Sequence, residues 1–145
     1  LFVENNLRRA LTQNELEVFY QPKLCLRSGR LLGLEALLRW NHPERGMIRP
    51  DQFISVAEET GLIIPIGKWV VRQACRMSKQ LGAIGLEGLQ MAINLSPKQF
   101  SDPDLAGAIA AILEQIKGAD LVVGAVLICL AALMAARFRG VKASN

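Results

Sequence analysis

A glutamate and an arginine stand four positions apart in an otherwise mostly apolar stretch that ends at Trp40. The alternation of a β-strand places Glu35 and Arg39 on the same face, opposite a face that is suited to packing against helices. Burial of either charge without a partner is costly, so each side chain needs a counter-ion or a ligand. Two alternatives follow: an ion pair between Glu35 and Arg39, or a metal-binding carboxylate beside a phosphate-binding guanidinium.

Two further polar side chains are candidates for the same site. Asn94 lies near the C-terminal end of a predicted strand at residues 89–95, and parallel barrels collect their functional residues at such ends. An asparagine in this position also commonly forms a turn. Gln21 stands near the end of an earlier predicted strand, and its position alone does not indicate whether it has a functional role.

The histidine and cysteine content argues against a zinc site. The chain has one histidine, His42, and three distant cysteines, Cys25, Cys75 and Cys129, which form no CxxC pair. We expect these cysteines to be core or near-core thiols in a reducing compartment. The net charge of 17 − 13 = +4 is mild and dispersed, which suits a small anion better than a nucleic acid polymer.

Periodicity predicts the elements that position these side chains. Strand signals occur at residues 16–21, 31–40 and 89–95, and helix signals at 3–13, 50–59, 63–81 and 104–115. Pro50 and Gly61 provide start and stop signals for the second helix. A turn is expected at residues 27–30 and a break in the chain at 42–46. This order of helices and strands indicates an α/β layered or barrel fold.

Four segments, in the same order and register, resemble the EAL domain family. They are Tyr20–Pro22, Glu35–Pro43 with the signature Glu35-Ala36-Leu37, Pro50–Ile63 and Asn94–Ser96. The resemblance covers roughly residues 3–115, which is less than half of the family domain. Within these segments, Pro43, Phe53 and Glu58 are expected to shape the early barrel.

The resemblance implies an α/β fold, a partial (β/α)8 TIM-like barrel of the EAL type with its first three strands and their helices. It also implies hydrolysis of cyclic-di-GMP to pGpG with Mg²⁺ or Mn²⁺. By position, Glu35 and Asn94 correspond to metal ligands. Arg39 corresponds to the arginine that holds a substrate phosphate, and Gln21 and Leu37 correspond to residues beside the ligand.

The later carboxylate motifs of the family are not found after Asn94. The acidic residues in that part of the chain are Asp102, Asp104, Glu114 and Asp120, and no Asp-Asp pair occurs anywhere in the sequence. Because a two-metal site needs several carboxylates, the catalytic set is incomplete and we expect the chain alone to be inactive. Two functions stay open: a truncated cyclic-di-GMP phosphodiesterase domain, or a degenerate cyclic-di-GMP-binding module without catalysis.

The sequence divides into an EAL portion at residues 1–117 and an apolar tail at 118–145 that does not resemble the family. Residues 121–136 are uncharged but shorter than the roughly 20 residues of a membrane span. We consider three interpretations: a buried strand and helix, a membrane span, or sequence joined by frameshift, rearrangement or misassembly. The expected location is the cytoplasm, with membrane association through 121–136 as the alternative.

The beginning of the chain favours a fragment, because it starts at Leu1 and shows no secretory leader. A barrel cut before closure leaves open strand edges and an uncovered apolar face. The expected partners are therefore cyclic-di-GMP and further copies of the chain.

We predict that the purified chain self-associates. Size-exclusion chromatography with light scattering is expected to show oligomers whose mass rises with concentration. A monodisperse monomer over the same concentration range would contradict this prediction.

Overall fold

The computed structural model describes residues 2–116, and the predicted tail with its three interpretations lies outside them. Its elements are α1 (Phe2–Thr12), β1 (Leu16–Leu24), β2 (Leu31–His42), β3 (Gly46–Ile48), α2 (Pro50–Glu59), α3 (Ile63–Ala83), β4 (Gln90–Ile93), the 3-10 helix η1 (Pro97–Ser101) and α4 (Leu105–Gln115). Every helix and strand predicted between residues 3 and 115 is present, whereas β3 and η1 are additional.

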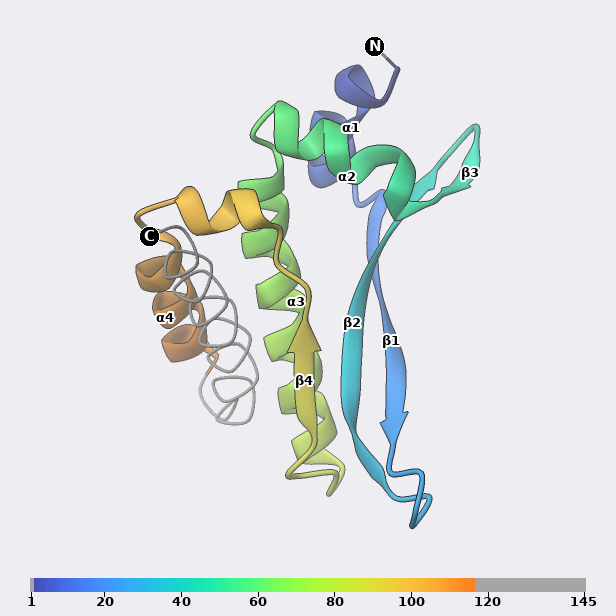
Figure 1. Cartoon of the computed structure of the whole chain (residues 1–145), viewed down its shortest axis with the longest axis vertical. Helices are drawn as coiled ribbons and strands as arrows, with labels where there is room; N and C mark the ends of the chain where they lie inside the picture. The colour runs from blue at the N-terminus through green and yellow to red at the C-terminus, as the bar shows by residue number, and fades with distance from the viewer. Residues whose placement is uncertain (1, 117–145) are drawn as a thin grey trace, which may run out of the picture.

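Strand β2 is paired on both edges (Figure 1). Along one edge β1 runs antiparallel to it, with Leu16 opposite Trp40. Along the other edge β4 runs parallel to it, from the Gly33–Gln90 pair to the Ala36–Ile93 pair. The chain reaches β4 through α2 and α3, and a helical crossover of this kind is what a parallel pair requires.

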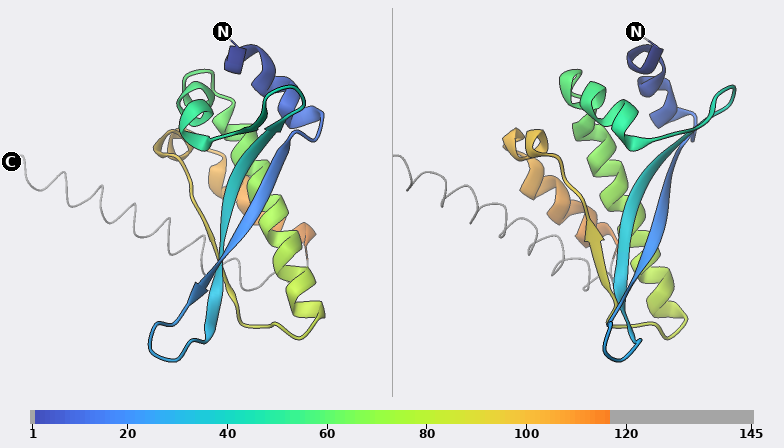
Figure 2. Two further views of the ribbon diagram at one scale, coloured as in Figure 1. Left: turned by 90° about the vertical axis from the view of Figure 1, so that its right-hand side faces the viewer. Right: turned by 45° about the vertical axis from the view of Figure 1, so that its right-hand side comes forward.

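One helix, α3, lies along one face of this sheet, whereas α1 and α2 lie at the end where β2 turns into β3 (Figure 1). Helix α3 contacts β1, β2 and β4, and α4 packs against α3 on its other side (Figure 2). The predicted inward residues Ala36 and Trp40 are buried at 3% and 0% exposure, which confirms the two-faced pattern of β2. Leu32 is the exception, because it lies beside the β1–β2 turn and is 42% exposed.

Two strand predictions need correction. Strand β1 continues through Pro22 to Leu24, because an edge strand of the described sheet tolerates a missing N–H group. The break expected at residues 42–46 is a tight hairpin, in which His42 pairs with Gly46 and Gly46 adopts a positive φ of 67°. The hairpin turns the chain from β2 into α2.

A buried carboxylate joins the start of β1 to the end of β2. Glu15 is 9% exposed and accepts hydrogen bonds from the Trp40 indole N–H at 3.1 Å and the Arg9 Nε at 2.9 Å. Burial raises the pKa of Glu15, whereas the hydrogen bonds from Trp40 and Arg9 lower it. Together the lowering effects exceed the effect of burial, so the pKa of Glu15 lies below its ordinary value. Arg9 also approaches the buried His42, with 3.0 Å between Nη2 and Nε2.

We predict that Trp40→Phe destabilises the fold at neutral pH by about 1–3 kcal/mol, because it removes a hydrogen bond to a buried charge. The lowered pKa of Glu15 stabilises the fold above its unfolded value of 4.5, and this contribution is lost as the pH falls through the folded pKa. In urea denaturation, the free energy of unfolding should therefore differ less between pH 7 and pH 3 for Trp40→Phe than for the original chain. Trp69→Phe, at the half-buried tryptophan of α3, serves as control and should leave the pH dependence unchanged.

Candidate functional site

The five predicted site residues lie together on the sheet face that is turned away from the helices. Gln21 on β1 stands directly opposite Glu35 on β2. On the other edge of β2, Ala92 of β4 is the partner of Glu35, so Asn94 follows two residues later on the same face. Leu37 and Arg39 continue this face along β2. The register of three strands thus brings together residues that are far apart in the sequence.

Glu35 is held between two polar side chains from neighbouring strands. The Asn94 Nδ2 donates a hydrogen bond to the Glu35 Oε1 at 2.7 Å. The Lys23 Nζ lies 3.8 Å from the Glu35 Oε2. The alternative of a Glu35–Arg39 ion pair is therefore wrong, because the cation beside Glu35 is Lys23. Sequence reasoning missed Lys23 because β1 was expected to end at Gln21. Continuing the alternation by one step past Pro22 would have found it.

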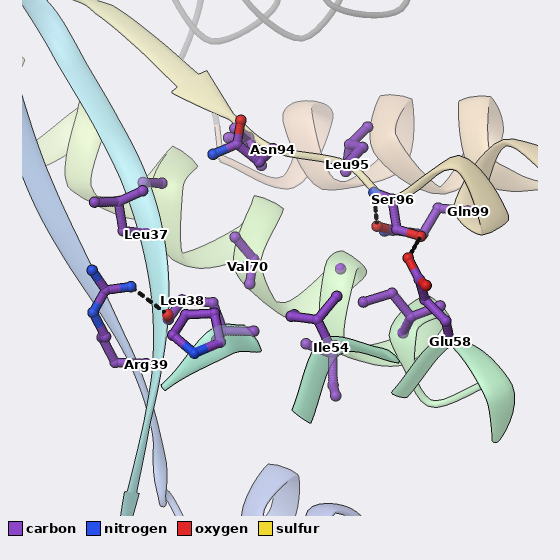
Figure 3. Close-up of a pocket in the computed structure, with 16 residues that line it drawn as sticks. Leu37, Leu38, Arg39, Ile54, Glu58, Val70, Asn94, Leu95, Ser96 and Gln99 are labelled. Atoms are coloured by element: carbon purple, nitrogen blue, oxygen red, sulfur yellow. Dashed lines mark hydrogen bonds between the residues drawn. The ribbon is translucent and has the colours of Figure 1, made fainter. Parts of the chain in front are cut away.

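Arg39 is folded back along β2 (Figure 3). Its Nη1 donates to the Leu38 carbonyl at 2.8 Å, and its guanidinium carbon lies 5.8 Å from the Phe19 ring centroid. Arg39 forms no ion pair with any of the described residues. Its cross-strand neighbour Glu17 accepts a hydrogen bond from Asn41 instead, at 3.3 Å. The guanidinium therefore keeps free donors with which it can bind an anion.

A cavity of about 280 Å³ opens where β2 and β4 separate beyond their last pair. Leu37, Arg39 and Asn94 line it from the site face, and side chains of α2 and α3 form its floor (Figure 3). Apolar side chains predominate, with a few polar groups at the rim. This composition is typical of sites for small molecules, and the volume lies near the lower end of their range.

A second polar cluster lies at the other side of the cavity. The Ser96 Oγ donates to the Glu58 Oε1 at 2.5 Å, and the Ser96 N–H donates to the Gln99 Oε1 at 2.8 Å (Figure 3). Glu58 was expected to have a structural role, and this bond ties α2 to the turn after β4. Gln99 is only 2% exposed. Sequence reasoning missed it, because a glutamine in a polar turn gives no signal of burial.

The oxygen ligands on the site face suit a hard cation, but they are few. Carboxylate and amide oxygens are the ligands that Mg²⁺ prefers, and Glu35 and Asn94 offer one of each. Among residues 2–116, however, no group of three or more His, Cys, Asp or Glu side chains could hold a metal ion. This part of the chain therefore fits a portion of a two-metal centre and not the whole of one.

Comparison with known proteins gives consistent matches. The family model described as "EAL domain" matches residues 4–124. The cyclic di-GMP phosphodiesterase PdeR of Escherichia coli is 41% identical over 116 residues, which are 80% of this chain and 17% of PdeR. MucR of Pseudomonas aeruginosa, a bifunctional diguanylate cyclase and cyclic di-GMP phosphodiesterase, is 43% identical over 72% of this chain and 15% of its own length.

Solved structures agree with these matches. The MucR phosphodiesterase in complex with c-di-GMP superposes with a TM-score of 0.77 and 40% identity, covering 80% of this chain and 47% of that one. The FimX EAL domain from Pseudomonas aeruginosa bound to c-di-GMP gives a TM-score of 0.69 at 25% identity, with 79% and 45% covered. This chain thus spans less than half of either structure. No helix among the described residues is long and apolar enough to cross a membrane.

We predict that Gly33→Ala weakens the β2–β4 pairing, because a Cβ at Gly33 would lie 2.2 Å from the Gln90 carbonyl oxygen. The clash is with backbone, so the expected destabilisation is about 1–3 kcal/mol in urea denaturation. Gly82→Ala in α3 is the matched control, since its Cβ would meet only the Glu87 side chain at 3.9 Å. Equal stability of the two variants would contradict the close approach of β4 at Gly33.

Proposed function

Because this chain belongs to the EAL domain family, we propose that it forms the first part of a metal-dependent cyclic-di-GMP phosphodiesterase domain. The observation that supports this function best is the shared sheet face, on which Glu35 contacts Asn94 while Arg39 keeps free donors. The similarity to EAL structures confirms the predicted fold, an α/β arrangement that is part of a TIM-like barrel.

In the proposed site, Glu35 and Asn94 would hold Mg²⁺ or Mn²⁺ and the other three residues would bind the dinucleotide. Arg39 would pair with a phosphate through charge-assisted hydrogen bonds. Leu37 would contact a base through its apolar side chain, and Gln21 would hydrogen-bond beside it. When bound, the metal ions neutralise charge at the phosphate and activate water. A cytosolic dinucleotide as substrate favours a cytoplasmic location for the domain.

The relatives support this assignment. Both relatives reported above carry phosphodiesterase in their names, and both reported structures are complexes with c-di-GMP. The chain spans 17% of PdeR and 15% of MucR. The activity of a whole protein of this kind therefore depends on further residues outside the part described. Within residues 2–116, Glu35 and Asn94 offer two side chains with oxygen ligands.

Binding without hydrolysis is the second candidate for the chain as given. It is favoured by the small number of acidic ligands among residues 2–116, together with the free guanidinium of Arg39. In that case Arg39, Gln21 and Leu37 would recognise the dinucleotide, and the chain would release no product.

We predict that the chain binds cyclic-di-GMP and that Arg39→Ala weakens binding about 10- to 100-fold, as expected for a charge-assisted hydrogen bond. Isothermal titration calorimetry provides the measurement. Arg76→Ala, which removes an exposed arginine from α3, is the matched control and should bind as the original chain does. Equal affinity of the Arg39→Ala variant and the original chain would contradict the phosphate-binding role.

A second measurement separates the two candidate functions. Cyclic-di-GMP is incubated with the chain and either Mg²⁺ or Mn²⁺, and pGpG is quantified by chromatography. We expect binding without release of pGpG from the chain alone. Replacing the matching part of the MucR phosphodiesterase with residues 4–116 should restore release, and Glu35→Gln in that hybrid should abolish it. Steady turnover by the chain alone would show that its catalytic set is complete.

A further inference from the structure

Asn94 lies one residue beyond the end of the sheet. The last pair between β2 and β4 is Ala36–Ile93, so backbone hydrogen bonds between strands do not fix Asn94. Its side chain is solvent-exposed, yet its Nδ2 reaches Glu35 at 2.7 Å. Some other contact must therefore set the direction in which the chain leaves β4.

The turn formed by residues 94–99, which includes the start of η1, is attached to the helices through Ser96. The Ser96 side chain donates to Glu58 on α2 and accepts from the Lys98 N–H at 3.2 Å. The Ser96 backbone N–H donates to the Gln99 Oε1 at 2.8 Å. The hydroxyl and the backbone N–H of Ser96 therefore both have partners. Because Ser96 is two residues from Asn94, these contacts restrict the path of the chain at Asn94.

The orientation of the Gln99 amide is determined by its surroundings. Rotating the amide by half a turn would place its NH₂ group against the Ser96 N–H, and two donors would then face each other. In the observed orientation the Gln99 Nε2 is buried and has no hydrogen-bond partner among the described residues. The contact with Ser96 thus persists although the other half of the amide stays unsatisfied, which is costly.

Gly67 on α3 makes room for this amide. A Cβ at Gly67 would lie 1.7 Å from the Gln99 Nε2, so any other residue there would displace the glutamine. A glycine within a helix is itself unfavourable by roughly 0.5–1 kcal/mol relative to alanine. Two unfavourable local features, a helical glycine and an unsatisfied amide, thus coincide at one contact next to the candidate site.

We propose that Gln99 is a positioning residue that acts through Ser96 to direct Asn94 toward Glu35. Gln99 sits in the space left by Gly67, holds the Ser96 backbone, and thereby fixes the exit of the chain from β4. The metal-binding consequence rests on the proposed function, because it requires that Glu35 and Asn94 bind the same ion. The geometric consequence, contact between Asn94 and Glu35, does not depend on it.

The test uses the full chain with Gln99→Met, which preserves size but cannot accept a hydrogen bond from Ser96. In ¹⁵N-resolved NMR, the Asn94 side-chain NH₂ signals should move toward the positions that they take in Glu35→Ala, which removes the acceptor of the Asn94 hydrogen bond. Titration with Mn²⁺ should show a roughly 10- to 100-fold loss of affinity, the range found for groups that orient metal ligands. Lys98→Met is the matched control, because it places the same residue at an exposed position of the same turn.

A second variant and a double substitution keep the test decisive. Gly67→Ala leaves Gln99 in the sequence but excludes its amide, so it should reproduce both effects if Gln99→Met does not fold. In Asn94→Ala, adding Gln99→Met should cost little further Mn²⁺ affinity, since Gln99 acts through Asn94. Independent, additive losses would overturn the proposal, as would unchanged Asn94 signals in folded Gln99→Met. If the original chain does not bind Mn²⁺, the metal-binding function fails, and the Asn94 signals alone decide the positioning role.

Discussion

Strand β2 is hydrogen-bonded along both edges, and its register determines what both faces of the sheet present. The antiparallel pairing with β1 places Gln21 opposite Glu35, and the parallel pairing with β4 places Ala92 beside it. A shift of one residue on either edge would exchange the two faces of a strand. The same register buries Trp40 among the helices and leaves Glu35 on the site face. The core and the site therefore depend on one alignment.

Buried and partly buried polar contacts hold the sheet to the helices at places where backbone pairing ends. At the end of β2, Trp40 and Arg9 satisfy the buried carboxylate of Glu15. Beyond β4, Glu58 and Gln99 satisfy Ser96. Unpaired polar groups in such positions are costly, so these contacts restrict the directions that the chain can take. Apolar packing alone is less selective in direction, because it depends mainly on the area that is buried.

Local signals in the sequence predicted most of the elements. Helix α2 runs from Pro50 to Glu59 as expected, since a proline start and a glycine stop are encoded within the segment itself. Alternation identified the two faces of β2 and therefore the face shared by the candidate site residues. Their individual roles stay predictions, as does the boundary between residues 117 and 118, which lies outside the described part of the chain.

What the sequence did not reveal depends on contacts between distant residues. Strand β3 is short and follows a tight turn, so it has too few residues to show alternation. Lys23 was missed because Pro22 suggests an end to a strand, and only pairing along one edge permits it to continue. The burial of Gln99 results from the missing side chain of Gly67, which lies on a different element. Periodicity within a segment does not contain this information.

The two edges of β2 differ in how soon their partners are synthesised. Strand β1 is connected to β2 by a short turn, whereas Glu35 and Asn94 are 59 positions apart. The entropy cost of closing a loop rises with its length, and structures with local contacts form faster. A nascent chain emerging from the ribosome can thus bring β1 and β2 together before β4 has emerged. The hairpin then acts as a template, along whose open edge the later parallel strand aligns.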